Sequence, residues 1–176
     1  MKYGIYYAYW EKEWNGDYKY YIDKISKLGF DILEISCGAF SDYYTKDQEL
    51  IDIGKYAKEK GVTLTAGYGP HFNESLSSSE PNTQKQAISF WKETLRKLKL
   101  MDIHIVGGAL YGYWPVDYSK PFDKKRDLEN SIKNMKIISQ YAEEYDIMMG
   151  MEVLNRFEGY MLNLSLIHIS EPTRRS

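Results

Sequence analysis

The sequence predicts an α/β fold, a (β/α)₈ TIM barrel of which the chain supplies about five βα units. Short apolar runs alternate with segments whose apolar residues recur every three or four positions, as strands and amphipathic helices do. The repeat is roughly 30 residues long, which is the size of one strand with its helix. The strands are almost continuously apolar, and this is typical of a parallel sheet covered by helices.

The first two units are marked by residues that cap and end helices. Residues 3–9 form a β-prone run and predict the first strand. Asp17 can cap the next helix, and Gly29 can end it. The apolar face of that helix consists of Tyr21, Ile22, Ile25 and Leu28. Residues 31–36 then predict a second strand, and a second helix runs from about residue 50 to Gly61.

Three further strands follow at similar spacing. Residues 62–66 predict the third strand, and Pro81 opens a long third helix. Residues 103–110 predict the fourth strand, and a fourth helix covers about residues 127–145. The inward face of this fourth helix is expected to carry Ile132, Met135, Ile138 and Ala142. Residues 147–154 predict the fifth strand.

The segment after the first strand separates two α/β architectures. A doubly wound sheet requires a glycine-rich phosphate turn there, and residues 10–14 read WEKEW instead. A barrel carries its functional residues where strands end and βα loops begin. The segments at these positions are AYWEKEW, GYGPHF, GGALYGYWP and EVLNRFE. Functional residues are therefore expected in these four segments.

Composition narrows the class of protein. Of the 176 residues, 43% are hydrophobic, which is enough for one core. The net charge is -2 and no basic run interleaves with aromatics, so nucleic acid is excluded as a partner. No apolar run approaches the roughly 18 residues of a membrane span, and no signal peptide is evident. Cys37, the one cysteine, permits no internal disulfide. A cytoplasmic protein without membrane contact is expected.

The last residues of the chain break the pattern. Residues 164–176 read LSLIHISEPTRRS, and no amphipathic helix follows where a fifth one is due. The segment resembles translated sequencing-adapter read-through, although a genuine short tail is the alternative. Residues 1–163 are therefore interpreted as the N-terminal part of a single barrel domain, and His168 is not a ligand candidate.

Two glutamates are the sharpest candidates for chemistry. Glu152 lies near the end of an apolar strand, where a buried carboxylate is costly unless a cation compensates it. A metal ligand that also acts as a general base would satisfy this requirement. Glu158 follows in the loop and could accept hydrogen bonds from sugar hydroxyls. The alternative for Glu152 is an ion pair with Arg156 or a lysine. For Glu158 the alternative is a solvated loop charge, which could also pair with Arg156.

Other candidates carry weaker signals. Aromatic residues make up 15% of the chain and cluster at residues 6–14 and 111–118, where they could stack on a sugar or simply pack. Small residues at 107–109 would let a ligand approach the backbone. His71 could contact a ligand, although a histidine in such a loop is more often solvated. His104 is interpreted as structural. Cys37 is interpreted as a small buried residue rather than a nucleophile.

The motifs also resemble a known family, the ketose 3-epimerases, which include the D-psicose (D-allulose) and D-tagatose 3-epimerases. The matching stretches are GIYYAYWEKEW, YKYYIDKISKLGFDILEIS, GGALYGYWPVDY and MEVLNRFEGY. The resemblance implies a barrel of the xylose-isomerase-like type. It implies C3 epimerisation of a free ketohexose through a cis-enediolate, with two glutamates removing and returning the proton from opposite faces.

The resemblance also implies a site. A divalent metal, Mn²⁺ or Co²⁺ with Mg²⁺ as an option, is held by Glu, Asp, His and Glu. Glu152 matches the first ligand and one member of the acid/base pair, and the other ligands fall on later strands that this chain lacks. Glu158 matches a residue that binds the O1/O2 end of the sugar. The pocket wall is matched by Tyr6, Trp14, Ala109 and Trp114, with Gly67 and Tyr68 at a neighbouring position. Tyr68 stands where relatives have a histidine, which leaves the preferred ketose open.

Truncation and rival functions bear on the expected activity. A five-stranded piece with open edges is expected to fold poorly or associate, and to be inactive alone, because it carries one metal ligand of four. The parent is expected to be a homo-oligomer, a dimer or tetramer, acting on a small-molecule ketose. Hydroxypyruvate isomerase, inosose dehydratase, sugar-phosphate epimerase and a non-catalytic sugar-binding half-barrel are the alternatives. No Arg/Lys clamp for a phosphate is apparent in this half.

Overall fold

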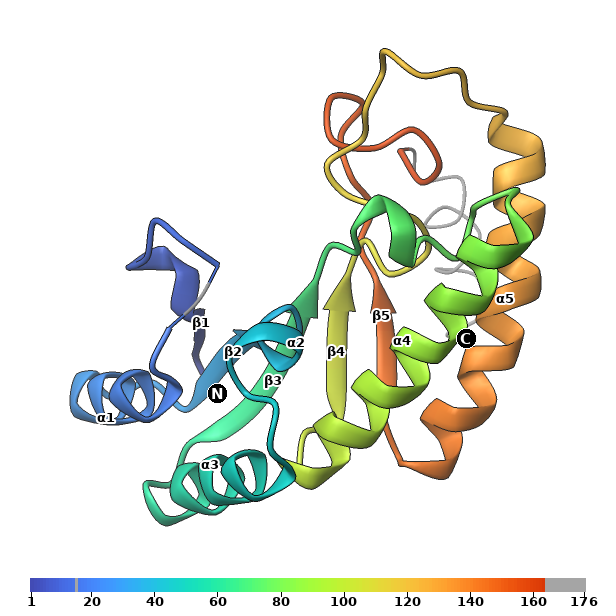
Figure 1. Ribbon diagram of the computed structural model, residues 1–176. Helices are drawn as coiled ribbons and strands as arrows, with labels where there is room; N and C mark the ends of the chain where they lie inside the picture. Colours follow the sequence, from blue (N-terminus) through green and yellow to red (C-terminus); the bar gives the residue numbers. More distant parts are fainter. Residues whose placement is uncertain (15, 164–176) are drawn as a thin grey trace, which may run out of the picture.

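The computed structural model describes residues 1–14 and 16–163, so the predictions for residues 164–176 lie outside the described residues. Its centre is one parallel sheet whose strand order follows the chain (Figure 1). The strands are β1 (Gly4–Tyr6), β2 (Ile32–Ser36), β3 (Thr63–Tyr68), β4 (Ile105–Gly108) and β5 (Met148–Met151). This order, with a helix between successive strands, confirms the predicted alternation of strands and helices.

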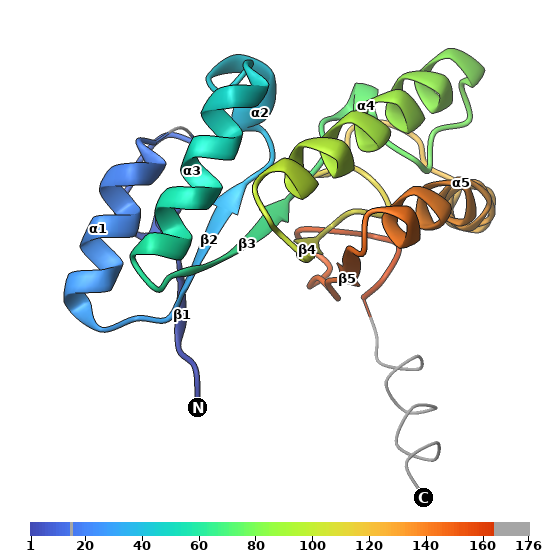
Figure 2. The same cartoon turned by 90° about the horizontal axis from the view of Figure 1, so that it is seen from below.

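The helices lie on the outer side of the sheet. They are α1 (Tyr18–Leu28), α2 (Ala39–Asp42), α3 (Asp47–Glu59), α4 (Pro81–Leu100) and α5 (Lys124–Glu144), with short 3₁₀ turns at Tyr7–Tyr9 and Phe72–Glu74. Figure 2 shows α1, α3, α4 and α5 following one another along the curved sheet. Within the described part of the chain, no helix has the length and apolar character needed to cross a membrane.

The hydrophobic core fills the space between the helices and the sheet. In β2, Leu33 and Ile35 are fully buried, whereas Glu34 between them is only partly buried. This alternation directs Leu33 and Ile35 to the helices and Glu34 to the inner face of the sheet. The largest side chain buried against them is Trp91 of α4. Each fully buried aliphatic side chain stabilises the fold by about 1.5–3 kcal/mol.

The strand register aligns particular residues on the inner face. Tyr6, Glu34 and Thr65 are paired across β1, β2 and β3. Two residues further along β2, Ser36 begins the next level of paired residues. Across β3, β4 and β5 that level consists of Gly67, Gly107 and Gly150, which we call the glycine row. Because these three positions carry no side chain, the inner face of the sheet is hollow at this level.

Helix ends follow the predicted signals. The Asp17 carboxylate accepts hydrogen bonds from the backbone N–H groups of Lys19 (3.0 Å) and Tyr20 (3.2 Å), which caps α1. Gly29 ends α1 in the left-handed conformation, with φ of 81°. Pro81 is the first residue of α4, where its missing N–H costs nothing.

Several predictions about the elements are wrong, among them the lengths of the fourth and fifth strands, which are Ile105–Gly108 and Met148–Met151. The first strand ends at Tyr6 instead of residue 9, because Tyr7 turns into the core and is fully buried. Leu28 is 58% exposed, since it is the last residue of α1. Ile132 is 49% exposed because it faces an apolar groove between α5 and β5, which Met149 and Met151 also line.

His104 joins two loops at the amino ends of the strands, the opposite end of the sheet from the predicted site. Its Nδ1 atom lies 2.8 Å from the Asp146 carbonyl oxygen, and its Nε2 atom lies 3.2 Å from the Asp102 carboxylate. The hydrogen bond with the Asp146 backbone, followed by that with Asp102, raises the pKa of His104. These contacts agree with the predicted structural role.

We expect these contacts to make stability depend on pH. Since the pKa of His104 is higher in the folded state than its unfolded value of about 6.5, protonation stabilises the fold. This contribution is fully present below the unfolded pKa and is lost as the pH rises through the folded pKa. In urea unfolding between about pH 5.5 and 8.5, the free energy of unfolding of the unsubstituted chain should fall relative to that of His104→Gln as the pH rises. Parallel pH profiles of the two proteins would contradict this assignment.

Candidate functional site

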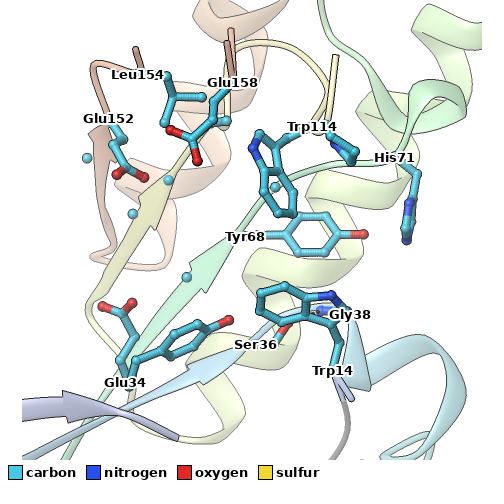
Figure 3. Close-up of a pocket in the computed structure, with 18 of the residues that line it drawn as sticks. Trp14, Glu34, Ser36, Gly38, Tyr68, His71, Trp114, Glu152, Leu154 and Glu158 are labelled. Carbon is cyan, nitrogen blue, oxygen red and sulfur yellow. Dashed lines mark hydrogen bonds between the residues drawn. The ribbon is translucent and has the colours of Figure 1, made fainter. Parts of the chain in front are cut away.

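A pocket of about 880 Å³ opens on the inner face, at the carboxyl ends of the strands (Figure 3). Barrel proteins carry their sites at this end. The structure brings together in its lining all the site residues that the sequence singled out. They are Tyr6, Trp14, Gly67, Tyr68, Ala109, Trp114, Glu152 and Glu158. Their shared position makes a common site possible, and their individual roles stay predictions.

One side of the pocket is aromatic. The rings of Trp14 and Trp114 meet edge to face, with centroids 6.1 Å apart, and Tyr6 lies 6.3 Å from Trp14. Trp114 is packed against Gly69, where an added Cβ would lie 3.0 Å from the Trp114 Cβ. The loops after β1, β3 and β4 therefore meet to form this wall. Aromatic faces of this kind suit the C–H faces of a sugar ring.

Tyr68 ends β3 and extends the wall inward. Its ring stacks on Phe90 of α4 with centroids 5.3 Å apart. Its hydroxyl donates a 2.6 Å hydrogen bond to the Glu74 carboxylate, which also accepts one from the backbone N–H of His71 at 2.8 Å. His71 itself is exposed, as the solvated alternative predicts, and it lines the pocket.

Glu152 follows β5 directly. Its backbone N–H donates to the Gly108 carbonyl (3.0 Å), and its own carbonyl accepts from the Tyr111 hydroxyl (3.0 Å). Its side chain is exposed, so the prediction of a buried carboxylate is wrong. The reason is that β5 lies at the edge of the sheet formed by the described residues and the pocket is open beside it. Burial, and then the charge of Glu152, raises the pKa of Tyr111 to about 12.

Glu158 is held by its own loop. The Asn155 side-chain oxygen accepts hydrogen bonds from the backbone N–H groups of Phe157 (2.8 Å) and Glu158 (3.1 Å), and its amide nitrogen donates to the Glu158 carboxylate. The alternative ion pair with Arg156 is absent, since no ion pair within residues 1–14 and 16–163 includes Arg156. Figure 3 shows the Glu152 and Glu158 carboxylates directed into the same space.

Besides Glu13, the pocket lining contains a further carboxylate that the sequence did not point to, Glu34 of β2. Burial is the main cause that raises its pKa, and the negative charge of Glu152 adds to it, while a hydrogen bond from the Thr65 side chain opposes the rise. The available signal was one acidic residue among apolar ones in residues 32–35, the same pattern that drew attention to Glu152. Cys37, by contrast, is fully buried as expected.

The loops around the pocket are tied to one face of α5. The Asn134 side chain donates to the Leu76 carbonyl (2.8 Å), and the Ser131 hydroxyl donates to the Tyr111 carbonyl (2.7 Å). The Asp127 carboxylate accepts from the Tyr160 hydroxyl at 2.8 Å. All three α5 side chains are buried, and we call Asp127, Ser131 and Asn134 the polar stripe of α5. It contacts the loops after β3, β4 and β5 in turn.

The described residues do not by themselves form a metal centre. No group of three or more His, Cys, Asp or Glu residues among them lies close enough to hold an ion. Glu152 is one carboxylate, and stable binding of a divalent cation requires several oxygen or nitrogen ligands. A metal bound here would need ligands from outside the described residues.

Parallel strands in chain order, outer helices and a pocket at the carboxyl ends of the strands define a protein of the (β/α)-barrel class. A family model described as "Xylose isomerase-like TIM barrel" matches residues 22–171. The chain therefore belongs to the xylose isomerase-like TIM barrel family.

Within this family the chain is similar to sugar epimerases. It is 57% identical over 163 residues to a D-psicose 3-epimerase of Enterocloster bolteae and 47% identical to one of Ruminiclostridium cellulolyticum. The solved D-psicose 3-epimerase of Clostridium cellulolyticum with D-tagatose superposes with a TM-score of 0.90 at 47% identity, over 94% of this chain. The matches cover 93% of this chain but 54% and 55% of the two relatives, so the chain spans about half of their length.

Two adjacent glycines allow the backbone geometry of the pocket to be tested. Gly108 has φ of 123°, and an added Cβ would lie 2.2 Å from the Tyr68 carbonyl oxygen. Gly108→Ala should therefore lower the free energy of unfolding by about 2–4 kcal/mol. The control is Gly107→Ala, whose Cβ would meet its nearest atom, the Gly150 carbonyl oxygen, at 3.9 Å and should change stability by less than about 1 kcal/mol. Equal losses in urea unfolding would contradict this geometry.

Proposed function

We propose that the chain contributes to a metal-dependent enzyme that inverts C3 of a free ketohexose such as D-fructose, D-psicose or D-tagatose. The observation that supports this most is the pocket. It combines an aromatic wall with the carboxylates of Glu152 and Glu158, in a chain 57% identical to a D-psicose 3-epimerase. The pocket lining within the described residues contains no Lys or Arg, and this favours a neutral sugar over a sugar phosphate.

The proposed chemistry uses Glu152 as one of two proton-transfer groups. The C3 proton of a ketose is acidic because the neighbouring C2 carbonyl can take up the electron pair. Removal of that proton breaks the C3–H bond and leaves a cis-enediolate, and return of a proton to the opposite face of C3 inverts the centre. Glu152 acts on one face. The group for the other face comes from outside this chain.

The other pocket residues bind and orient the sugar in this proposal. Glu158, whose loop is held by Asn155, accepts hydrogen bonds from hydroxyls at the O1/O2 end. Trp14, Trp114 and Tyr6 stack on the C–H face of the sugar and exclude water. We also propose that Glu152 is one ligand of a divalent metal, Mn²⁺ or Co²⁺, whose remaining ligands lie outside the described residues. Assembly as a homo-oligomer is a further prediction for the parent enzyme.

The chain alone is expected to show no epimerase activity. It carries one member of the acid/base pair, and inversion requires a proton donor on each face of C3. The measurement is chromatography of D-fructose incubated with the purified chain and Mn²⁺, with D-psicose as the product sought. Binding of ketose without turnover fits this expectation, whereas catalytic formation of D-psicose contradicts it.

Supplying the other half should restore turnover. We would co-produce the chain with the part of the Enterocloster bolteae relative that lies outside the aligned 163 residues. Conversion of D-fructose to D-psicose is expected, and Glu152→Gln should lower kcat by about 10²- to 10⁴-fold, because general acid–base groups contribute that much.

The matched control for this experiment is Glu129→Gln, which removes the same charge from an exposed position of α5. It should leave kcat unchanged. An assembled complex in which Glu152→Gln keeps the full rate would refute the catalytic assignment. A product other than the C3 epimer would instead support one of the related isomerases.

A further inference from the structure

We propose that Glu34 is a specificity-determining residue that accepts a hydrogen bond from a sugar hydroxyl at the floor of the pocket. This inference rests on the proposed function, because it assigns a new contact in the same site. Glu34 lines the pocket together with the residues already described. It comes from β2, on the far side of the pocket from the segment after β5 that carries Glu152 and Glu158.

The register of the sheet places Glu34 at the floor of the pocket. It pairs with Tyr6 of β1 and Thr65 of β3, one level below Ser36 and the glycine row. Leu33 and Ile35 on either side of it face the core, so the Glu34 side chain is directed to the inner face. Figure 3 shows its carboxylate turned toward the space that Glu152 also faces.

The glycine row makes room for this carboxylate. A Cβ added at Gly67 would lie 2.8 Å from Oε1 of Glu34 and 3.4 Å from its Cδ. The missing side chain at Gly67 therefore leaves the volume that the Glu34 carboxylate occupies. Gly107 and Gly150 continue the open floor beside it, where an added Cβ would meet nothing closer than 3.8 Å. A ligand group can thus approach the Glu34 carboxylate over bare backbone.

The carboxylate retains unused hydrogen-bonding capacity. An ionised carboxylate offers about four acceptor positions, and the Thr65 side chain supplies one hydrogen bond to Glu34. None of the ion pairs formed within the described part of the chain includes Glu34. A partly buried charge without a cation is costly unless donors satisfy it. Sugar hydroxyls are neutral donors that fit this need.

The neighbours of Glu34 fit a polyol better than an ion. Tyr6 and Ser36 line the pocket beside it, so the floor presents hydroxyl groups next to the Glu34 carboxylate. An anionic ligand would be repelled by Glu34, Glu152 and Glu158 together, and a metal site is not formed by the described residues. A ketose that reaches both Glu34 and Glu158 is held from two sides, which makes its hydroxyl configuration matter.

The first test detects the contact directly in the full 176-residue chain. Glutamate side-chain carboxyls are labelled with ¹³C, and the Glu34 signal is assigned by its absence in Glu34→Gln. D-Fructose is then titrated in. The expected result is a saturable shift of the Glu34 signal together with those of Glu152 and Glu158. Shifts at Glu152 and Glu158 without one at Glu34 would overturn the inference. No shift at any of the three would contradict the proposed contact in this chain, whereas the proposed function is judged separately by epimerisation in the two-chain enzyme.

The second test separates binding from structure in the two-chain enzyme described above. Glu34→Gln should raise KM for D-fructose about tenfold or more and leave kcat within about threefold, because a hydrogen bond to a charged group is lost in both ground and transition states. Glu34→Asp keeps the charge, but its side chain is one methylene shorter and holds the carboxylate farther from the sugar, so it should raise KM similarly. Glu129→Gln should change neither constant.

A structural role would give a different outcome. If Glu34 merely supports the sheet, Glu34→Gln and Glu34→Asp would lower the melting temperature while KM stays at the parent value, and this would overturn the inference. Failure of the proposed function can be told apart from failure of this inference, because the unsubstituted two-chain enzyme would then show no epimerisation at all. Should Glu34→Gln fail to fold, the Glu34→Asp variant decides by the same KM comparison.

Discussion

The pocket depends on three buried hydrogen bonds between the polar stripe of α5 and the loops after β3, β4 and β5. Asp127, Ser131 and Asn134 are spaced by four and three residues, so they share one face of the helix. Through Ser131 the helix holds the backbone of Tyr111, and the Tyr111 hydroxyl in turn holds the backbone of Glu152. Loss of any such buried bond leaves an unsatisfied polar group, which costs about 1–3 kcal/mol. A helix on the outside of the sheet thus positions a carboxylate on its inside.

Regular local signals made the order of elements predictable. Asp17, Gly29 and Pro81 act at the helix ends where the sequence placed them, because caps depend on a few neighbouring backbone groups. The strand lengths were less predictable. The first strand stops at Tyr6 because Tyr7 is taken into the core, and such a tertiary contact leaves no periodic trace in the sequence.

The residues that sequence reasoning missed are polar residues on unexpected faces. The sequence does not distinguish a buried Asp, Ser or Asn on a helix from a solvated one. The polar stripe of α5 therefore has the pattern of an exposed helix face, although it is buried. Ile132 was assigned inward for the complementary reason, because it is apolar. An acidic residue among apolar ones was the signal for Glu34, but its place beside Gly67 follows from the register between β2 and β3, which no single strand reveals. The barrel architecture marked the strand-end segments, and the resemblance to the ketose 3-epimerases identified the individual pocket residues within them.

The two sides of the pocket differ in how their chemistry is built. The aromatic side joins loops after β1, β3 and β4 through ring contacts such as that of Trp14 with Trp114. Ring contacts have preferred geometries, but they are satisfied over a range of centroid distances of about 4.5–7 Å. The acidic side holds Glu152 and Glu158 through backbone and amide hydrogen bonds, which are directional. The backbone that carries these two carboxylates is therefore held by directional contacts, whereas the wall that faces it is held by ring packing.

The glycine row limits how this pocket can change over evolutionary time. Glycine is already the smallest residue, so every substitution at Gly67, Gly107 or Gly150 adds volume and can only narrow the cavity. Acceptance of a bulkier substrate would have to arise from the aromatic wall, by shortening Trp14, Trp114 or Tyr68. Substitutions in the glycine row can therefore only reduce the cavity volume, whereas substitutions in the loops can reduce or enlarge it. Substitutions that change substrate preference should therefore occur mainly in the loops, while the glycines of the sheet stay the same.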